Sequence, residues 1–178
     1  MSKKVIRFSL DTTDINRAIR ELNEFKRDFR KKVDTYRKRI ADEIAVKASL
    51  NFGSAIVDDA ISGGSSRSPD VQVNVTERGS ISVIVADGED AVWCEFGSGV
   101  YRNGSVGGSP HPYGSDLGFT IGSYGEGKGK QQVWGYYTDP ENKTGLVLTR
   151  GTPASMPMYN AAQEVLHKSV EIAREVFG

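Results

Sequence analysis

One amphipathic pattern near the start of the chain limits what this sequence can fold into. Apolar residues recur at steps of three and four from Ile15 to Ala48, and Lys, Arg, Asp and Glu fill the positions between them. This spacing predicts a single long helix over about residues 14–50, with the side-chain oxygens of residues 11–14 capping its first amides. The steps follow the 3.6-residue period rather than a strict heptad, and acidic residues are mixed into the basic face. We therefore expect a helix packed on a sheet, rather than a coiled coil or a DNA-reading helix.

Alternating apolar and polar residues predict strands on both sides of this helix. Residues 5–10 (VIRFSL) alternate as a short strand with one buried face does. Residues 71–87 form two alternating runs joined around residues 77–80, which predicts an antiparallel hairpin. We expect three valines of the first run to pair with three apolar residues of the second: Val71, Val73 and Val75 with Ile81, Val83 and Val85.

Two further helical segments are predicted in the second half of the chain. The run AVWCEF (residues 91–96) begins a short helical or irregular segment that stops at the following Gly-Ser-Gly. After Pro157, apolar positions from Ala161 to Val176 recur at helical spacing, which predicts an amphipathic helix at the C-terminal end of the sequence.

Between these helical segments, residues 99–150 are rich in Gly, Ser and Tyr and lose helical periodicity. Residues 118–121, 132–137 and 145–148 are candidates for short strands, and a stretch this long without firm elements usually serves a function or an interaction. The predicted fold class is α+β, with a small antiparallel β-sheet packed against a long N-terminal helix and a C-terminal helix. We expect one domain over residues 1–178, in which residues 99–150 are an inserted flexible or β-rich loop region.

The charges balance overall but not along the sequence. The chain carries 23 basic and 23 acidic side chains, yet residues 1–50 hold fourteen basic and eight acidic ones, so this part carries +6 and the remainder −6. Opposed halves suit head-to-tail packing of identical subunits, although charge alone favours a solvated basic helix. The single cysteine excludes an intrachain disulfide, and no segment resembles a signal peptide or a membrane span. These features predict no membrane association and synthesis in the cytoplasm.

Motifs for catalysis or cofactor binding are weak. Residues 122–130 (GSYGEGKGK) match the beginning of a P-loop, but Gly129 stands where the Mg²⁺-binding hydroxyl is needed, and the residues that follow read as a strand. Cys94 with His111 and His167 suggests a thiol nucleophile and a base, although a lone cysteine between Trp93 and Phe96 is typical of a small buried hydrophobic residue. The spacing of these residues forms no metal motif. We expect no enzyme activity, cofactor or metal.

Two groups of residues are candidates for contact with a partner. The basic cluster on the long helix, which includes Arg30, Lys31, Arg37 and Arg39, is suited to a polyanion or an acidic neighbour. In the inserted region, aromatic and basic side chains are interleaved, as in single-strand-binding and protein-binding surfaces. Acidic residues share the segment, which favours protein contacts. The candidates there are Tyr124, Lys128, Lys130 and Trp134. A nucleic-acid-binding module that uses the basic helix remains the alternative function.

The segment AVWCEFGSG (residues 91–99) resembles the Tyr-Ala-x-x-Val-Glu-Phe-Gly-Thr signature of small tail-component proteins of long-tailed bacteriophages, the head–tail joining or tail-completion family of minor tail proteins. A second matching segment is GTPASMPMYNAA (residues 151–162), where that family returns through a proline-containing stretch into its last helix. The long charged helix and the hairpin match as well. Trp93-Cys94, Ser98 and the residues after Pro157 depart from the family pattern.

This resemblance implies a structural virion protein of a phage or prophage, made in the bacterial host cytoplasm and located in the tail or neck. It implies a homo-oligomeric ring, such as a hexamer, that contacts connector or neck proteins on one side and the tail terminator or tail tube protein on the other. DNA would pass through the lumen without sequence-specific contacts.

The motif residues Glu95, Phe96 and Gly97 are candidates for the subunit interface. Glu95 is expected either to pair with the basic helix of a neighbouring subunit, for example at Arg30, Lys31, Arg37 or Arg39, or to cap or pair within its own subunit. The sequence leaves both alternatives open.

Overall fold

The computed structural model describes residue 9 and residues 11–58, 60–98, 110–119 and 133–178. Helix α1 runs from Thr12 to Ser54, four residues beyond the predicted end. The carboxylate of Asp11 accepts hydrogen bonds from the amides of Thr13 and Asp14 at 2.8 and 2.9 Å, and these bonds fix where the helix begins. The strand expected over residues 5–10 lies outside the described residues apart from Ser9, which is not in a strand.

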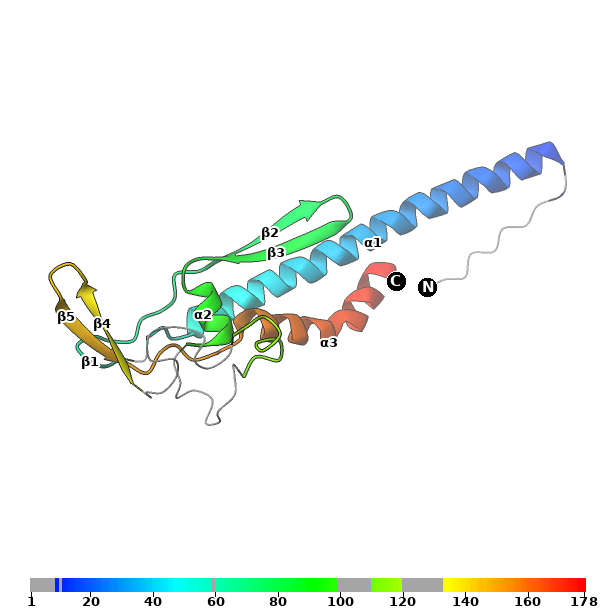
Figure 1. Cartoon of the computed structure of the whole chain (residues 1–178). Coiled ribbons are helices and arrows are strands. Elements are labelled where there is room, and N and C mark those ends of the chain that lie inside the picture. The colour runs from blue at the N-terminus through cyan, green and yellow to red at the C-terminus, as the bar shows by residue number, and fades with distance from the viewer. Residues whose placement is uncertain (1–8, 10, 59, 99–109, 120–132) are drawn as a thin grey trace.

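The C-terminal half of α1 is covered on two sides (Figure 1). Helix α3 (Pro157–Phe177) runs antiparallel along one side, where Lys47 pairs with Glu164 at 2.5 Å and Arg39 pairs with Glu175 at 2.6 Å. The hairpin of β2 (Gln72–Arg78) and β3 (Ile81–Asp87) covers the adjacent side. The buried face of α1 between these elements consists of Ala41, Ala45, Ala48 and Phe52. Three alanines in this row allow the neighbouring backbones to approach closely.

The predicted hairpin is confirmed, but the predicted pairing of its valines is wrong. Val73 lies opposite Ala86, and Val75 lies opposite Ile84. Only Gly79 and Ser80 separate the two strands, and a two-residue connection pairs odd-numbered with even-numbered positions. Because side chains alternate between the two faces, the face with Val73 and Val75 packs inward, and exposed Ile81 and Val85 lie on the other face.

A second small sheet combines two strands of the region predicted as an insertion with one strand from before it. Its strand order is β1 (Ala60–Ser62), β5 (Thr144–Thr149) and β4 (Trp134–Asp139), all antiparallel. Two of the three candidate strands are thus confirmed, while Gly118 and Phe119 lie outside any strand, and residues 120–121 are outside the described residues. Figure 1 shows this sheet at the far end of the molecule from the start of α1. The fold class is α+β, with two small sheets in place of the one predicted.

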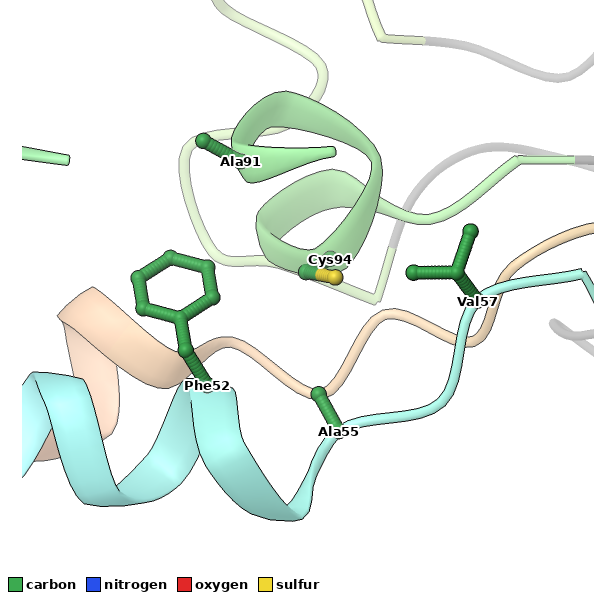
Figure 2. Close-up of a cluster of buried hydrophobic side chains, with 5 residues drawn as sticks. All are labelled: Phe52, Ala55, Val57, Ala91 and Cys94. Carbon is green, nitrogen blue, oxygen red and sulfur yellow. The ribbon is translucent and has the colours of Figure 1, made fainter. Parts of the chain in front are cut away.

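The short helix α2 (Ala91–Phe96) closes the core over the end of α1. Its residues Ala91 and Cys94 pack in one buried cluster with residues from the end of α1 and the segment that follows it: Phe52, Ala55 and Val57 (Figure 2). This cluster joins the end of α1, the start of β1 and the turn after β3, so it holds the two small sheets to the helical part of the molecule. Among the described residues, neither long helix has an apolar stretch sufficient to cross a bilayer.

A bidentate ion pair fixes the loop before β2 against the start of α2. Both nitrogens of the Arg67 guanidinium donate to Asp90, at 2.6 and 2.8 Å, and the amide of Asp70 donates to the same carboxylate at 3.0 Å. These donors hold the pKa of Asp90 below its ordinary value of 3.8, the Arg67 hydrogen bonds most of all. Asp90 is buried, so its carboxylate relies on these three bonds.

We expect Asp90→Asn to lower the free energy of unfolding by about 1–3 kcal/mol at neutral pH, because a buried charge-assisted pair loses one partner. A depressed pKa stabilises the fold above pH 3.8, and this contribution is lost as the pH falls below 3.8 through the pKa of the folded state. Denaturant unfolding at several pH values measures both effects, with Asp87→Asn on an exposed carboxylate as the control. Equal loss of stability in the two variants would contradict this assignment.

Candidate functional site

The two segments that carry the family resemblance lie against each other. The amide of Ser98 donates to the carbonyl of Thr152 at 2.8 Å, and the amide of Thr152 donates back to the Ser98 hydroxyl at 2.8 Å. The amides of Ser155 and Met156 donate to the carbonyl of Cys94 at 2.9 and 3.2 Å. Residues 94–98 and 152–156, far apart in the sequence, therefore form a single joint between α2 and α3.

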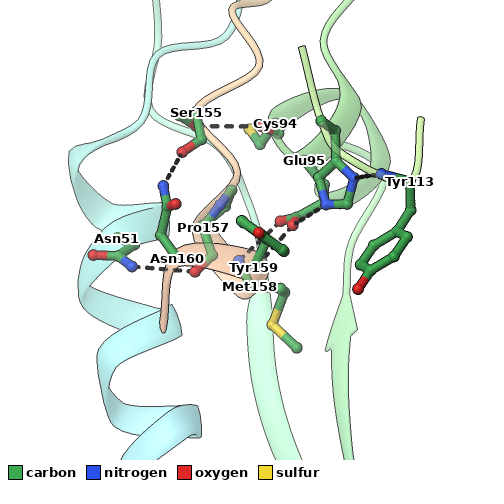
Figure 3. A network of polar contacts seen from close by, with 10 residues as sticks. Asn51, Cys94, Glu95, Tyr113, Ser155, Pro157, Met158, Tyr159 and Asn160 are labelled. Carbon is green, nitrogen blue, oxygen red and sulfur yellow. Dashed lines mark hydrogen bonds and ion pairs between the residues drawn. The ribbon is translucent and has the colours of Figure 1, made fainter. Parts of the chain in front are cut away.

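Glu95 is the centre of this joint. Its side chain is 8 % exposed, and its two carboxylate oxygens accept the amides of Met158 and Tyr159 in the first turn of α3 at 2.8 and 2.9 Å (Figure 3). The residue before α3, Met156, has a left-handed φ of 52° and makes no side-chain cap. Glu95 supplies the missing cap from another helix, and its negative charge lies where the helix dipole favours it. Of the two alternatives for Glu95, the structure shows the one within its own subunit.

His111 is a further hydrogen-bond partner of Glu95. Its Nε2 lies 3.2 Å from a carboxylate oxygen of Glu95, and its Nδ1 accepts the amide of Tyr113 at 3.1 Å. An acceptor Nδ1 carries no proton, so the proton of the neutral ring is on Nε2, which donates to Glu95. His111 thereby attaches residues 110–119 to the joint. Sequence reasoning considered His111 only as a base for a thiol, because nothing in the sequence connects it to Glu95.

Phe96 and Gly97 have structural roles beside Glu95. The ring of Phe96 stacks on Phe119 at a centroid distance of 4.1 Å and packs against His111 at 4.6 Å. Gly97 ends α2 with a φ of 79°, and a Cβ there would lie 3.0 Å from the Cβ of Ala154. Only glycine adopts this conformation at so close an approach without strain. Within the Glu-Phe-Gly motif, Glu95 thus contributes a carboxylate to the joint, Phe96 an aromatic ring, and Gly97 the space left by its missing side chain.

The hypothesis of a reactive thiol is not supported by the geometry. Cys94 is fully buried, and burial raises the pKa of its thiol to about 11. A thiol with such a pKa is protonated at neutral pH and does not act as a nucleophile. Among the described residues, no cluster of three or more His, Cys, Asp or Glu side chains has the arrangement needed to hold a metal ion.

The four basic residues predicted on α1 divide into two pairs. Arg37 contacts Glu77 and Ser82 of the hairpin, each at 2.5 Å, and Arg39 pairs with Glu43 and Glu175. Arg30 and Lys31 are exposed, and within the described part of the chain neither side chain forms an ion pair or a hydrogen bond. Arg37 and Arg39 therefore hold the fold together, whereas Arg30 and Lys31 are available to a partner.

Of the four candidates in the inserted region, Trp134 is the one among the described residues. Tyr124, Lys128 and Lys130 lie outside the described residues. Trp134 begins β4, where its backbone pairs with Thr149. In Figure 1 this strand lies beyond the C-terminal end of α1, at the opposite end of the molecule from the start of that helix.

An exposed apolar surface on α1 is the feature that sequence reasoning missed. We call it the α1 stripe. It lies on the N-terminal half of the helix, which extends past the end of α3 and past the hairpin (Figure 1). Its side chains are 36–57 % exposed: Ile15, Ile19, Leu22, Phe25, Phe29 and Val33. The periodicity that located the helix included these residues as part of a buried face, but the described elements leave them partly exposed, although Phe177 of α3 packs against Phe29 at 5.9 Å.

The chain has no match among known proteins by the three comparisons made. No protein-family model matches it, and neither a search of curated proteins nor a search of solved structures finds a match.

We expect Glu95→Gln to destabilise the joint by about 2 kcal/mol, because a neutral amide caps two helix amides less well than a carboxylate does. The Cys94 thiol lies one residue away and becomes accessible only when the joint opens, so its labelling rate by a thiol reagent should rise. Glu89→Gln is the matched control, since Glu89 is exposed and precedes the same helix. An unchanged labelling rate in Glu95→Gln would show that the cap is not needed.

Proposed function

We propose that this protein is a structural component of a tailed bacteriophage or prophage particle, and that it assembles as a ring at the head–tail junction or in the upper tail. The observation that carries this proposal is the joint around Glu95. The two sequence segments that resemble the tail-component family meet there, and each supplies what the other lacks: α2 provides the carboxylate, and α3 provides the amides. Both segments belong to one structural unit. A shared structural origin therefore explains the two resemblances better than two independent chance matches do.

The exposed surface of the protein supports a role in assembly. Monomeric proteins rarely expose a continuous row of large apolar side chains, and such rows mark sites of association. The α1 stripe is a row of this kind, and the adjacent Arg30 and Lys31 offer charges to an acidic partner. In the proposed setting the partners are connector or neck proteins on one side and the tail terminator or tail tube protein on the other. DNA passes through the lumen, and the mature location is the virion.

The alternative function, a nucleic-acid-binding module, has less support. Of the four basic residues that suggested it, Arg37 and Arg39 are engaged by carboxylates of the same chain.

Electron microscopy and native mass spectrometry of the purified full chain test the proposal. We expect closed rings of uniform stoichiometry and no salt-dependent affinity for DNA. A strictly monomeric species would contradict the proposal if it binds DNA with an affinity that falls steeply as salt increases. In that case the charge-reversal variant Arg30→Glu, compared with Arg78→Glu on the hairpin, would show whether the projecting half of α1 carries the binding.

A further inference from the structure

The α1 stripe is the uncovered continuation of a seam that is already filled in the C-terminal half of the same helix. There, α3 lies on one face of α1, and its last ring, Phe177, packs against Tyr36 at 6.0 Å and against Phe29 at 5.9 Å. Beyond Phe177 the same face of α1 continues toward Thr12 with nothing on it among the described residues. Even beside Phe177, the side chains of Phe29 and Val33 remain 42 % and 40 % exposed.

Within the projecting half, the spacing of the stripe is that of a helix–helix seam. When Lys26 takes the place of Phe25, which then lies at the border of the row, the steps from Ile15 to Val33 alternate four, three, four, three and four. Alternating steps of this kind keep one row of side chains facing a partner helix along its whole length. Lys26 is the one charged residue of that row between Ile15 and Val33.

We propose that two copies of this chain pair through their α1 stripes, with the two helices antiparallel and Ile15 of one copy opposite Val33 of the other. In this register Ile19 faces Phe29 of the second copy, and the arrangement repeats on the other side of the two-fold axis. Leu22 faces Lys26 of the second copy near the centre. The inference stands on the stripe alone and does not depend on the proposed role in a phage particle.

Lys26 determines the direction of the partner helix. If the two helices were parallel and in register, Lys26 would face Lys26 of the other copy inside the apolar seam, and two like charges would be brought together as they lose water. In the antiparallel pair each Lys26 lies against a leucine, over which its methylene groups pack while the ammonium group reaches solvent.

The residues that border the stripe agree with this direction. When one helix is turned end for end, each border faces the same border of its partner. On one side, Asn23 then lies opposite Asn23 of the second copy, and Arg30 lies opposite Asn16. On the other side, Phe25 lies opposite Phe25, and Lys32 lies opposite Ala18. Neither border brings like charges together, whereas the parallel arrangement would place Lys32 near Arg37.

In the filled seam and in the proposed one, the helix that packs on α1 runs in the same direction. Helix α3 runs antiparallel to α1, and so does the α1 of the second copy, which would begin near the end of α3. The negative end of the α3 dipole then lies near the positive end of the incoming helix. In this register residues 12–19 of the second copy lie level with residues 29–36, beside the end of α3, and they cover the surface of Phe29 and Val33 that Phe177 leaves exposed.

A two-fold contact joins two copies and leaves no free copy of the same surface. It is therefore a different interface from the one that would repeat around a ring. Chains that form no ring are expected as pairs. Chains that do form rings are expected as two rings joined face to face through their α1 helices.

Single cysteines and a short bis-maleimide crosslinker test the direction of pairing. Asn23→Cys should crosslink to a covalent pair, because the two thiols lie side by side. Ile19→Cys should not, because antiparallel packing separates its two copies by about 15 Å along the axis. Cys94 does not compete, since it is buried. Crosslinking of Ile19→Cys without Asn23→Cys would mean parallel helices, and no crosslinking in either would mean that the stripe is not shared; both results overturn the proposal.

Association measured by native mass spectrometry and sedimentation tests the stripe itself. Leu22→Gln should halve the mass of the assembly and weaken pairing on the order of 10-fold or more, because each pair loses two buried leucines. Glu24→Gln introduces the same residue on the opposite face and should pair as the unaltered chain does. Circular dichroism confirms that both variants fold, since Leu22 is 57 % exposed in the single chain.

The two proposals fail in different ways. If pairs form and no rings are seen, the proposed function fails and the pairing stands. If rings form whose mass and stability are the same in Leu22→Gln, the pairing fails and the proposed function stands.

Discussion

The contact between the Glu95 carboxylate and the first amides of α3 determines much of this structure. A helix leaves its first amides without partners, and the residue before α3, in a left-handed conformation, has no side chain suited to satisfy them. Because the cap comes from α2, the two helices are placed together, and the direction of α3 along α1 follows. That direction decides which face of α1 becomes core. Gly97 permits the close approach, and His111 uses the remaining hydrogen-bonding capacity of the carboxylate.

The same geometry divides α1 into two parts with different physical tasks. In the C-terminal part, small side chains at Ala41, Ala45 and Ala48 let α3 and the hairpin approach closely, so this face of the helix is buried, while Val46 and Leu50 stay exposed. In the N-terminal part the apolar residues are large, and they stay 36–57 % exposed even though Phe177 packs against Phe29. Burial of large apolar side chains stabilises an association far more than burial of alanines does. The change from alanines to Phe25 and Phe29 along one helix thus marks the change from folding within the chain to association outside it.

The sequence predicted the elements of this fold better than the contacts between them. The long helix, the hairpin and the last helix follow from local periodicity, which a single sequence displays. The register of the hairpin was predicted wrongly because it depends on whether two or more residues form the turn, and one residue of difference exchanges the two faces. The cap on α3 joins Glu95 to Met158 and Tyr159, and no periodic signal connects residues so far apart. The exposure of the stripe was equally hidden, since periodicity reveals an apolar face but not what covers it.

A charged residue in an apolar row usually lowers the stability of a helix pair. Lys26 shows that such a residue can also determine the direction of pairing. An entirely apolar stripe would attract a partner helix in either direction and in several registers, with little difference in free energy between them. A lysine near the centre costs the antiparallel pair little and the parallel pair much, so the difference in free energy between the two arrangements grows. The asparagines and the alanine on the borders act in the same sense, because they stand where a second charge would oppose Arg30 or Lys32. Specificity in the stripe therefore depends less on its apolar residues than on the few polar ones that interrupt and border it.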